Sequence, residues 1–332
     1  MKMAFSLLIF YISLHIILST QNIPEGYEVA PWYLFKPSVI TYSIDDGSYN
    51  HLAKAVPLLD KYNLKATFNL ITSIENDWKG YKAAAENGHE IASHTITHPN
   101  IKEFDKETQT KELKESKKLI EKMVGQECVT LAYPYCFGGD VEIAKKYYIS
   151  ARGCSSEYIS PDTDNFFDLS SFPIGSAYNL KTDEDLNKIV DKGLEEKKWT
   201  VFLIHGIDSN SEFSPLETFE LEKHLQYVVK NENNFWVATF KDVTKYILEA
   251  NSLNITENIK DEKNIEIEVS TEYKTDITKL DVPVTISKKL NDECKNVSIL
   301  KGNDLEEVKS GIIEGKIIFD VIPEEKYIIK CE

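Results

Sequence analysis

The feature that most constrains this fold is the regular alternation of short apolar runs with longer amphipathic runs between residues 38 and 251. The apolar runs predict β-strands at 38–44, 65–71, 89–94, 129–135, 149–153, 199–206 and 235–240. The amphipathic runs predict helices at 50–62, 78–88, 105–125, 139–148, 183–197, 216–231 and 241–251. This alternation is typical of a parallel sheet with crossover helices, and about six or seven such units can close a barrel. We therefore expect an α/β fold built on a closed or distorted (β/α) barrel.

The rest of the chain predicts three further segments. Residues 1–20 combine a positive start with an apolar run whose length suits a secretory signal peptide better than a membrane span. The alternating pattern occupies residues 21–251, and the polar residues 252–263 predict a linker. Short alternating runs in residues 264–332 predict a small all-β, sandwich-like domain. We expect a secreted, extracellular protein with no stable membrane insertion after signal removal.

Cysteine usage is compatible with secretion, because disulfides persist in oxidising compartments. The chain has five cysteines, so at least one thiol is free or paired between chains. We expect Cys294 to pair with Cys331. Two of Cys128, Cys136 and Cys154 are candidates for a second pair within the main domain.

The charge of the chain limits its partners. A formal net charge of -16 argues against binding to nucleic acid or to anionic membranes, whose protein partners carry basic patches. The sequons at Asn254 and Asn296 would make the protein a glycoprotein only if it enters the secretory route. The oligomeric state is not constrained by the sequence.

Polar residues gather where several predicted strands end. The first strand ends at Asp45 and Asp46, the third runs into "SHTITHP" with His94 and His98, and a later one ends in "LIHG". In parallel α/β folds, chemistry collects at the carboxyl ends of the strands. These side chains are therefore candidates for one shared site.

Two imidazoles and one carboxylate suggest a metal centre. His94 and His98 are four residues apart, so one helical turn would place both rings on one side. Such a set suits Zn²⁺ and leaves a coordination position open. Beside a divalent cation, one of the two adjacent aspartates can bind the ion while the other accepts a proton from the attacking water. The alternative is an ordinary Asp-Gly turn and two unrelated loop histidines.

Two further strand-end residues have the chemistry to assist. His205 would lie across the barrel mouth from the histidine pair and could protonate a leaving group. Tyr135 follows Pro134, and its backbone N–H could point at a developing oxyanion. The alternatives are a buried structural histidine and a packing tyrosine.

These motifs, "SIDDGS", "SHTITHP", "AYPY" and "FLIHG" in this order, resemble those of NodB-like polysaccharide deacetylases, carbohydrate esterase family 4. The resemblance covers roughly residues 28–250. It implies a distorted barrel, a divalent metal that is usually zinc, and hydrolysis of an acetyl group from an acetylated sugar. Carried over by position, it assigns these roles: Asp45 the catalytic base; Asp46, His94 and His98 the metal ligands; Tyr135 the oxyanion N–H; His205 the general acid.

The sequence departs from the family pattern at two places. The family motif R-x-P-Y has Ala132 at its arginine position, and Arg152 is the only arginine in the chain. We expect Arg152 to approach the Asp45 carboxylate from the neighbouring strand, the alternative being a surface ion pair. The Asp-Trp motif that orients the acid histidine is also missing, and its candidate substitutes are Asp162, Asp164 and Asp168.

The resemblance favours a hydrolase that removes acetyl groups from an N-acetylated polysaccharide, with chitin or chitooligosaccharides as the preferred substrate. O-acetylated xylan and peptidoglycan are alternatives, because a metal and a base serve both N- and O-deacetylation. A different class of function is a sugar-binding protein on a weakened enzyme fold. Exposed aromatic side chains could stack on sugar rings, the candidates being Trp32, Tyr33, Tyr49, Trp78 and Phe137.

Overall fold

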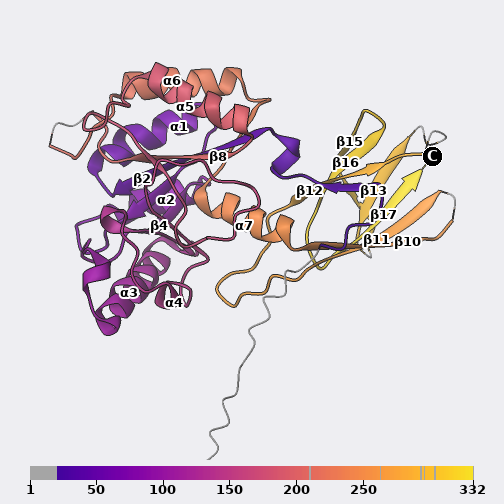
Figure 1. Cartoon of the computed structure of the whole chain (residues 1–332), viewed down its shortest axis with the longest axis horizontal. Coiled ribbons are helices and arrows are strands. Elements are labelled where there is room, and N and C mark those ends of the chain that lie inside the picture. Colours follow the sequence, from indigo (N-terminus) through magenta and orange to yellow (C-terminus); the bar gives the residue numbers. More distant parts are fainter. Residues whose placement is uncertain are drawn as a thin grey trace, which may run out of the picture.

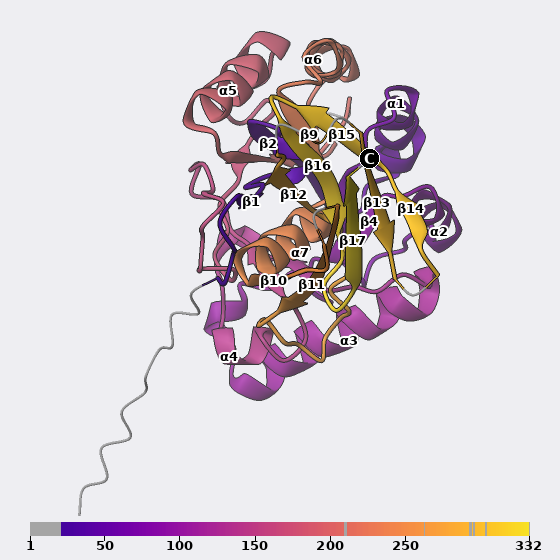
Figure 2. The same ribbon diagram turned by 90° about the vertical axis from the view of Figure 1, so that its right-hand side faces the viewer.

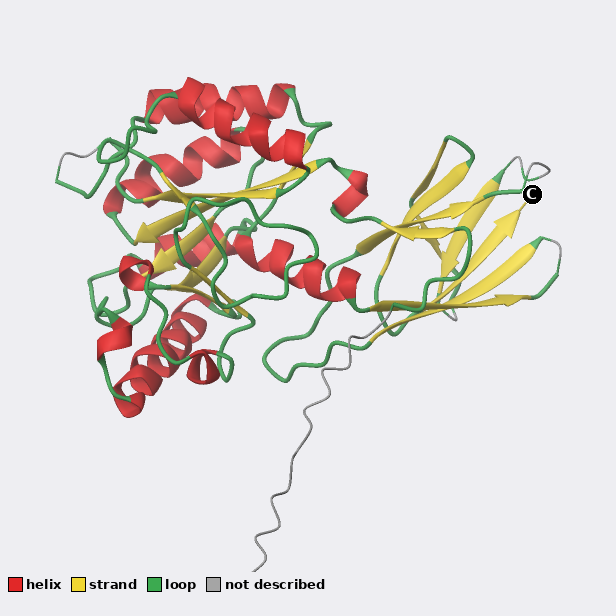
Figure 3. Ribbon diagram, in the orientation of Figure 1, coloured by secondary structure: helices red, strands yellow, loops and turns green. Residues whose placement is uncertain are grey.

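A computed structural model describes residues 21–208, 211–261, 263–291, 294, 296–302 and 304–331. The predicted signal peptide, residues 1–20, lies outside the described residues. The described chain forms an α/β barrel domain and an all-β domain that lie end to end (Figure 1). Figure 3 shows that the long helices belong to the barrel part and that the second domain consists of strands and loops. None of the helices in the described ranges combines the length and the apolar character that a bilayer span requires.

One curled sheet forms the barrel, and it contains the strands β2 (Ser38–Asp46), β3 (Thr67–Leu70), β4 (Glu90–Ser93), β5 (Thr130–Ala132), β6 (Ser150–Arg152), β7 (Phe172–Pro173), β8 (Trp199–Ile204) and β9 (Phe235–Val237). Its order is β6-β5-β4-β3-β2-β8-β7, with parallel pairing, and β9 pairs with the start of β2. The segment that bridges β6 at Leu169 continues into β7, which pairs with β8. This segment joins the two edges of the sheet, and the predicted distorted barrel is confirmed.

Helices follow most strands and cover the outside of the barrel (Figure 1). They are α1 (Val56–Lys61), α2 (Trp78–Glu86), α3 (Lys106–Val124), α4 (Val141–Ala144), α5 (Asp183–Glu196), α6 (Thr218–Lys230) and α7 (Phe240–Asn251). Short turns of other helix types are η1 (Tyr33–Phe35), η2 (His51–Ala55), η3 (Ile101–Glu103) and η4 (Pro134–Cys136), of which η2 is π-helical.

The helix ends are set by residues near the sequence-predicted boundaries. Asp105 caps α3 by accepting a hydrogen bond from the Thr108 N–H at 2.8 Å, and Gly125 ends it with a φ of 80°. Thr182 and Asp185 form a reciprocal capping box at the start of α5. These local signals explain why the long helices begin and end close to the predicted positions.

The second domain contains two antiparallel sheets around a shared apolar core. Its strands are β1 (Tyr27–Val29), β10 (Leu253–Ile259), β11 (Asn264–Thr271), β12 (Val284–Lys289), β13 (Val297–Lys301), β14 (Glu306–Val308), β15 (Ser310–Ile313), β16 (Lys316–Val321) and β17 (Lys326–Cys331). The sheet orders are β1-β12-β16-β15 and β10-β11-β17-β13-β14. The predicted all-β domain is therefore present.

Two predicted boundaries are wrong. The segment 252–263, predicted as a polar linker, contains the strand β10, which pairs with β11 over its whole length. Leu253 and Ile255 of β10 are fully buried, because their side chains point into the β domain while the polar residues between them face outward. In addition, β1 near the N-terminus pairs with β12 and so belongs to the β domain, not to the barrel.

Helix α7 connects the two domains and contributes to both of their cores. Phe240 and Val243 pack in the barrel, whereas Tyr246 and Ala250 pack in the core of the β domain. The Tyr246 hydroxyl also donates to the carbonyl of Ala30 at 2.9 Å. Figure 2 looks onto the β domain and shows α7 lying against it.

Both disulfides agree with the cysteine pairing expected from the sequence. Cys294 pairs with Cys331 in the β domain, and Cys136 pairs with Cys154 in the barrel. Cys128 is a buried free thiol. Burial raises the pKa of this thiol far above its ordinary value, so Cys128 is unreactive at neutral pH.

Candidate active site

The carboxyl ends of the barrel strands open onto one pocket of about 580 Å³. Six of the seven predicted site residues line this pocket: Asp45, Asp46, His94, His98, Tyr135 and His205. The seventh, Arg152, lies behind the pocket wall and is only 1% exposed. The sheet therefore brings together residues that are spread over most of the barrel sequence.

Asp46, His94 and His98 form a cluster that fits a divalent cation. The Asp46 Oδ1 atom lies 3.6 Å from His94 Nε2 and 3.8 Å from His98 Nε2. Ligand atoms of the three residues all lie within 4.8 Å of one another, so a single ion could sit at bonding distance from each of them. Two imidazoles and one carboxylate are a donor set that suits zinc and similar cations, and the fit supports a metal site.

A loop, not a helical turn, brings the two histidines together. The residues after β4 are irregular, and Thr95 and His98 have positive φ angles of 67° and 55°. Glu112 on α3 holds this loop by accepting hydrogen bonds from the backbone N–H groups of Ile96 and Thr97 at 2.8 and 2.9 Å. The expected helical spacing of the histidine pair is therefore wrong, although the two rings do converge, with centroids 4.7 Å apart.

The protonation states of the two histidines favour metal binding. Burial lowers the pKa of His94 to about 4 and also lowers the pKa of His98, so both rings are neutral ligands at neutral pH. The Nδ1 atom of His94 lies 2.8 Å from the carbonyl oxygen of Ala132, which orients the ring and leaves Nε2 facing Asp46. In the metal-free protein, burial and the charge of Asp45 raise the pKa of Asp46 to about 7.

Asp45 is held in a different environment from its neighbour Asp46. It is 2% exposed, its Oδ1 atom accepts a hydrogen bond from the Asn69 side chain at 2.8 Å, and its Oδ2 atom accepts one from Arg152. Burial alone would raise the pKa of this carboxyl group, but the charge and hydrogen bond of Arg152, together with His94 and His205, outweigh burial and keep the pKa below its ordinary value. Two adjacent aspartates thus differ in protonation behaviour because only one of them contacts the guanidinium.

Arg152 reaches Asp45 from the end of β6, as the sequence suggested. It lies in register with Ala132 on the neighbouring strand β5, the position where the family motif has its arginine. Its Nη1 atom also donates to the Gly153 carbonyl and the Ser171 hydroxyl, each at 3.3 Å. Because the side chain is buried and hydrogen-bonded, the alternative of a surface ion pair is wrong.

Tyr135 lies on the loop that follows β5. Its side chain is 59% exposed, and its ring packs edge-on against His98, with centroids 4.7 Å apart. Tyr135 and Cys136 have consecutive positive φ angles of 55° and 68°, which are unusual for residues other than glycine. The predicted role of the Tyr135 N–H stays a prediction.

His205 follows β8 and lines the pocket, but none of its proposed aspartate partners reaches it. Its Nδ1 atom is buried and has no hydrogen-bond partner among the residues that the structure describes. Asp162 accepts a hydrogen bond from Ser160, and the Asp168 carboxylate lies beside Gly153. Asp164 lines a separate pocket beside the loop at Tyr273.

A histidine that the sequence analysis missed supports His205 through its backbone. His51 is fully buried, and burial lowers its pKa to about 4, so its ring is neutral. The Nδ1 atom accepts a hydrogen bond from the Ser48 N–H at 3.2 Å, which leaves the proton on Nε2 to donate to the His205 carbonyl at 2.6 Å. His51 therefore links the turn after Asp46 to the backbone of His205.

Other residues were missed because their role depends on tertiary contacts. Asn69, which bonds Asp45, is the one amide in the apolar strand "TFNL", and this lone polar residue was the available signal. Phe213 packs edge-on against His205, with centroids 4.9 Å apart, and Tyr178 lines the same pocket. Of the proposed sugar-stacking aromatics, Phe137 lines the pocket, but Trp32 is only 1% exposed and packs in the protein core.

Comparison with known proteins agrees with this architecture. Residues 35–147 match the family model described as polysaccharide deacetylase. The chain is 34% identical over 106 residues to a Bacillus subtilis protein named "Putative polysaccharide deacetylase", a match that covers 30% of this chain and 38% of that protein. It is also 25% identical over 321 residues, 90% of its length, to a gellan lyase of a Bacillus species, but it spans only 13% of that protein.

A solved structure from Mycobacterium smegmatis, described as a "putative polysaccharide deacetylase", is similar in fold. The TM-score is 0.53 at 14% identity, and the match covers 66% of this chain and 95% of that one. This likeness supports the barrel fold, and the family match lies over the strands that carry Asp45, Asp46 and the histidine pair. Residues 35–147 of the barrel domain are therefore similar to the polysaccharide deacetylase family, which agrees with the resemblance to carbohydrate esterase family 4 that the motifs indicated.

Proposed function

We propose that this chain is a metal-dependent hydrolase that removes acetyl groups from an N-acetylated polysaccharide, with chitin or chitooligosaccharides as its substrate. The observation that carries the proposal is the pairing of Asp45 with Arg152 directly beside the Asp46, His94 and His98 cluster. This arrangement separates an ionised carboxylate that can accept a proton from a set of ligands that can hold a cation.

The residues of the pocket would divide the reaction between them. Asp46, His94 and His98 would hold the cation, which when bound supplies Lewis-acid chemistry that acidifies water and polarises a carbonyl group. Asp45, kept ionised by Arg152, accepts the proton of the water that attacks the acetyl carbonyl.

Two other groups act at the far side of the acetyl carbonyl. The Tyr135 N–H donates to the oxygen on which negative charge develops. His205 protonates the sugar nitrogen as it leaves, so that acetate and a free amino sugar are released. His205 and Asp45 line the same pocket, which supports their assignment as an acid and a base acting on one bound acetyl group.

The preference for an N-acetylated polysaccharide rests on the charge of the chain and on the aromatic side chains at the pocket. Removal of an N-acetyl group creates a cationic amine, and a chain with a net charge of -16 favours cationic over anionic glycans. Phe137 and Phe213 are 52% and 56% exposed at the pocket, where aromatic faces can stack on sugar rings. O-acetylated xylan and peptidoglycan are the substrates that the experiment below must separate from chitin.

We also propose that the protein works outside the cell. The support is the pair of disulfides, Cys136–Cys154 and Cys294–Cys331, which persist in oxidising compartments.

The test is an acetate-release screen over three substrates: N-acetylglucosamine oligomers, acetylated xylo-oligosaccharides and peptidoglycan fragments. Wild-type protein is assayed as purified, after chelation, and after Zn²⁺ is restored. We expect acetate from the N-acetylglucosamine oligomers only, loss of release after chelation, and recovery with Zn²⁺.

Two variants separate the base from the ligands. Asp45→Asn is expected to keep its metal and to lose activity by roughly 10²-fold or more, because the proton acceptor is removed. His98→Ala is expected to lose the metal itself, as measured by elemental analysis. Full turnover by metal-loaded Asp45→Asn would show that the assignment of the base is wrong.

A sugar-binding protein on the same fold is the alternative of another class. The observation that favours it is the unpartnered Nδ1 atom of His205, because an acid histidine is usually oriented by a second group. Binding of chitin oligomers by calorimetry, without acetate release under any metal condition, would support this alternative.

A further inference from the structure

We propose that the Cys136–Cys154 disulfide is a positioning element of the active site, which holds the Tyr135 loop at a fixed place relative to Arg152. The inference rests on the proposed function for its kinetic consequence, but not for its structural one. Tyr135 lies on the loop that follows β5 and Arg152 lies at the end of β6, and the disulfide forms a covalent bond between these two segments.

The disulfide lies where the pairing of β5 with β6 stops. The Tyr133 N–H donates to the Arg152 carbonyl at 3.0 Å, which continues the pairing by one residue beyond β5. The next residue on the β6 side, Gly153, instead donates its N–H to the Leu169 carbonyl at 2.8 Å. The two chains therefore separate at this point, and the bond between Cys136 and Cys154 reconnects them.

The loop that carries Tyr135 requires such a support. Tyr135 and Cys136 are consecutive residues with φ angles of 55° and 68°, in a region that L-residues with side chains rarely occupy. Strained backbone of this kind persists only where the surroundings hold it in place. The backbone bonds of this turn are local, from Cys136 to Tyr133 and from Phe137 to Pro134, so they do not fix the loop against β6.

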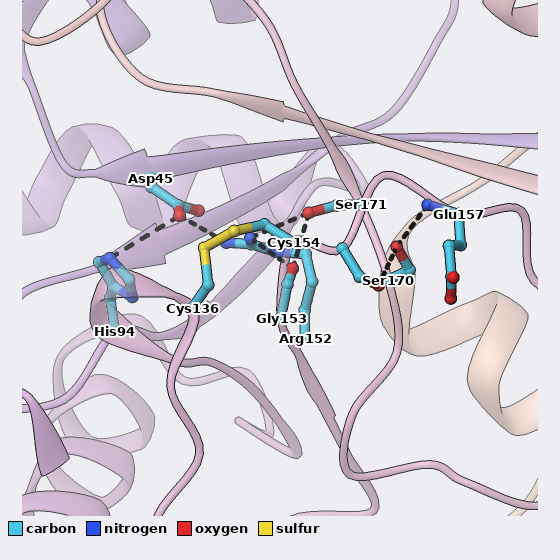
Figure 4. The surroundings of a disulfide bond; sticks show 10 residues. Asp45, His94, Cys136, Arg152, Gly153, Cys154, Glu157, Ser170 and Ser171 are labelled. Carbon is cyan, nitrogen blue, oxygen red and sulfur yellow. Dashed lines mark hydrogen bonds and ion pairs between the residues drawn. A yellow bond between two sulfur atoms is a disulfide. The ribbon is translucent and has the colours of Figure 1, made fainter. Parts of the chain in front are cut away.

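On the other side, the disulfide is two residues from the guanidinium that contacts Asp45. Figure 4 shows Cys136 and Cys154 together with Asp45, Arg152 and the Gly153 carbonyl that Arg152 contacts. Both cysteines also line the pocket that contains Asp45, and both are partly exposed, so a small reductant can reach the bond. Opening it would release the Tyr135 loop from the strand end that carries Arg152.

The chain provides its own control. The second disulfide, Cys294–Cys331, lies in the β domain and contributes no residue to the pocket. The remaining cysteine, Cys128, is buried and is not expected to react with an added alkylating reagent while the protein is folded. A Cys294→Ser/Cys331→Ser variant therefore leaves Cys136–Cys154 as the one reducible bond among the described cysteines.

The experiment uses this variant in oxidised form, after reduction by a phosphine, and after reoxidation. Alkylation and mass spectrometry count the opened thiols. Hydrogen exchange then compares the backbone amides of residues 133–138 and 152–155, and steady-state assays on N-acetylglucosamine oligomers give kcat and KM separately. The matched variant Cys136→Ser/Cys154→Ser, with the second disulfide intact, repeats the comparison without reductant.

We expect reduction to speed exchange at the amides of 133–138, to lower kcat at least tenfold with less than a threefold change in KM, and to be reversed by reoxidation. Unchanged exchange in this segment would overturn the inference, whatever the activity. Unchanged kcat with faster exchange would overturn the catalytic consequence. If the oxidised protein releases no acetate from any substrate, the proposed function fails, and the hydrogen-exchange comparison still decides whether the disulfide fixes the loop.

Discussion

Arg152 lies in register with Ala132 across the parallel strands β5 and β6, and its guanidinium donates to the carboxylate of Asp45. The strand after β5 therefore supplies the charge that the family motif places on β5 itself. Adjacent parallel strands present register partners to the same side of the sheet, so a side chain of arginine length can reach the same carboxylate from either strand.

We predict that Arg152→Ala raises the pKa of Asp45, because the cation that stabilises its ionised form is removed while the burial remains. Asp45 must be deprotonated to accept a proton, so the acid limb of the kcat/KM profile should move to higher pH. Activity at neutral pH should fall by roughly 10²-fold. Acetate release measured between pH 5 and 9 checks both effects.

Arg152→Lys is the control for charge alone. It keeps a cation but loses the planar group that contacts Asp45, Gly153 and Ser171 together. Its acid limb should lie between those of the wild type and Arg152→Ala. An unshifted limb in Arg152→Ala would contradict the assignment of Asp45 as the titrating base.

A second prediction concerns protons released on metal binding. In the metal-free protein the pKa of Asp46 is raised to about 7 by burial and by the charge of Asp45, so at pH 6 this carboxyl group is largely protonated. Binding of Zn²⁺ should then displace about one proton at pH 6 and close to none at pH 8. Calorimetry in buffers with different ionisation enthalpies measures this number.

Asp45→Asn is the matched control for proton release. It removes the like charge next to Asp46, so the pKa of Asp46 should fall and fewer protons should be released at pH 6. The metal should still bind, because the three ligands are intact. Equal proton release by this variant and the wild type would show that the Asp45 charge does not set the Asp46 pKa.

A third prediction tests His51 as a support for His205. His51→Leu removes the hydrogen bonds to Ser48 and to the His205 carbonyl, and kcat should fall between roughly tenfold and 10²-fold while KM changes little. His51→Gln, whose amide nitrogen can replace Nε2, should recover part of kcat. His224→Leu is the control, because His224 is also buried but bonds Asn187 on α5. Equal loss of kcat in His51→Leu and His224→Leu would indicate a general effect on the fold.

The last prediction concerns Glu249 on α7, where the two domains meet. Burial, and then the charge of Asp281, raise its pKa to about 8, and these two effects outweigh the nearby Lys245 charge and the Val282 backbone N–H. Because the pKa of Glu249 is higher in the folded protein than in the unfolded chain, protonation of Glu249 favours the folded state. This contribution to the free energy of unfolding is complete below the ordinary pKa, near 4.5, and is lost as pH rises through about 8. The free energy of unfolding should therefore decrease over this range.

Glu249→Gln removes this dependence, because an amide does not ionise. We expect the variant to be more stable than the wild type at pH 8 by roughly 1–3 kcal/mol and to be similar at pH 4.5. Denaturant unfolding at several pH values between 4.5 and 8.5 provides the comparison. A wild-type stability that is flat across this range would contradict the raised pKa.

Most of the barrel could be predicted because its signals are local. Each strand is a short apolar run, each long helix has a cap such as Asp105 or a left-handed end such as Gly125, and the two repeat in order. The strand β10 was missed because its polar residues outnumber its apolar ones. Leu253 and Ile255, which alternate with polar residues, are buried because β10 pairs with β11. The polar composition of the segment does not reveal this pairing.

The candidate site was predictable where chemistry follows directly from position at a strand end, as for Asp45, Asp46 and His205. Arg152 could be identified because the chain has no other arginine. Asn69 could not, because its contact with Asp45 depends on the exact register of β3 against β2. The histidine loop was misjudged because its left-handed residues, Thr95 and His98, carry no glycine signal.

Helix α7 is continuous and packs in two hydrophobic cores, with Phe240 in the core of the barrel and Tyr246 in the core of the β domain. Truncation of the chain after residue 251 would remove most of the β domain and expose the Tyr246 face of α7 to solvent. The β domain is therefore not an independent unit joined to the barrel by a flexible linker. A glycan bound by the β domain would therefore be held in a fixed orientation relative to the pocket that contains Asp45 and Asp46.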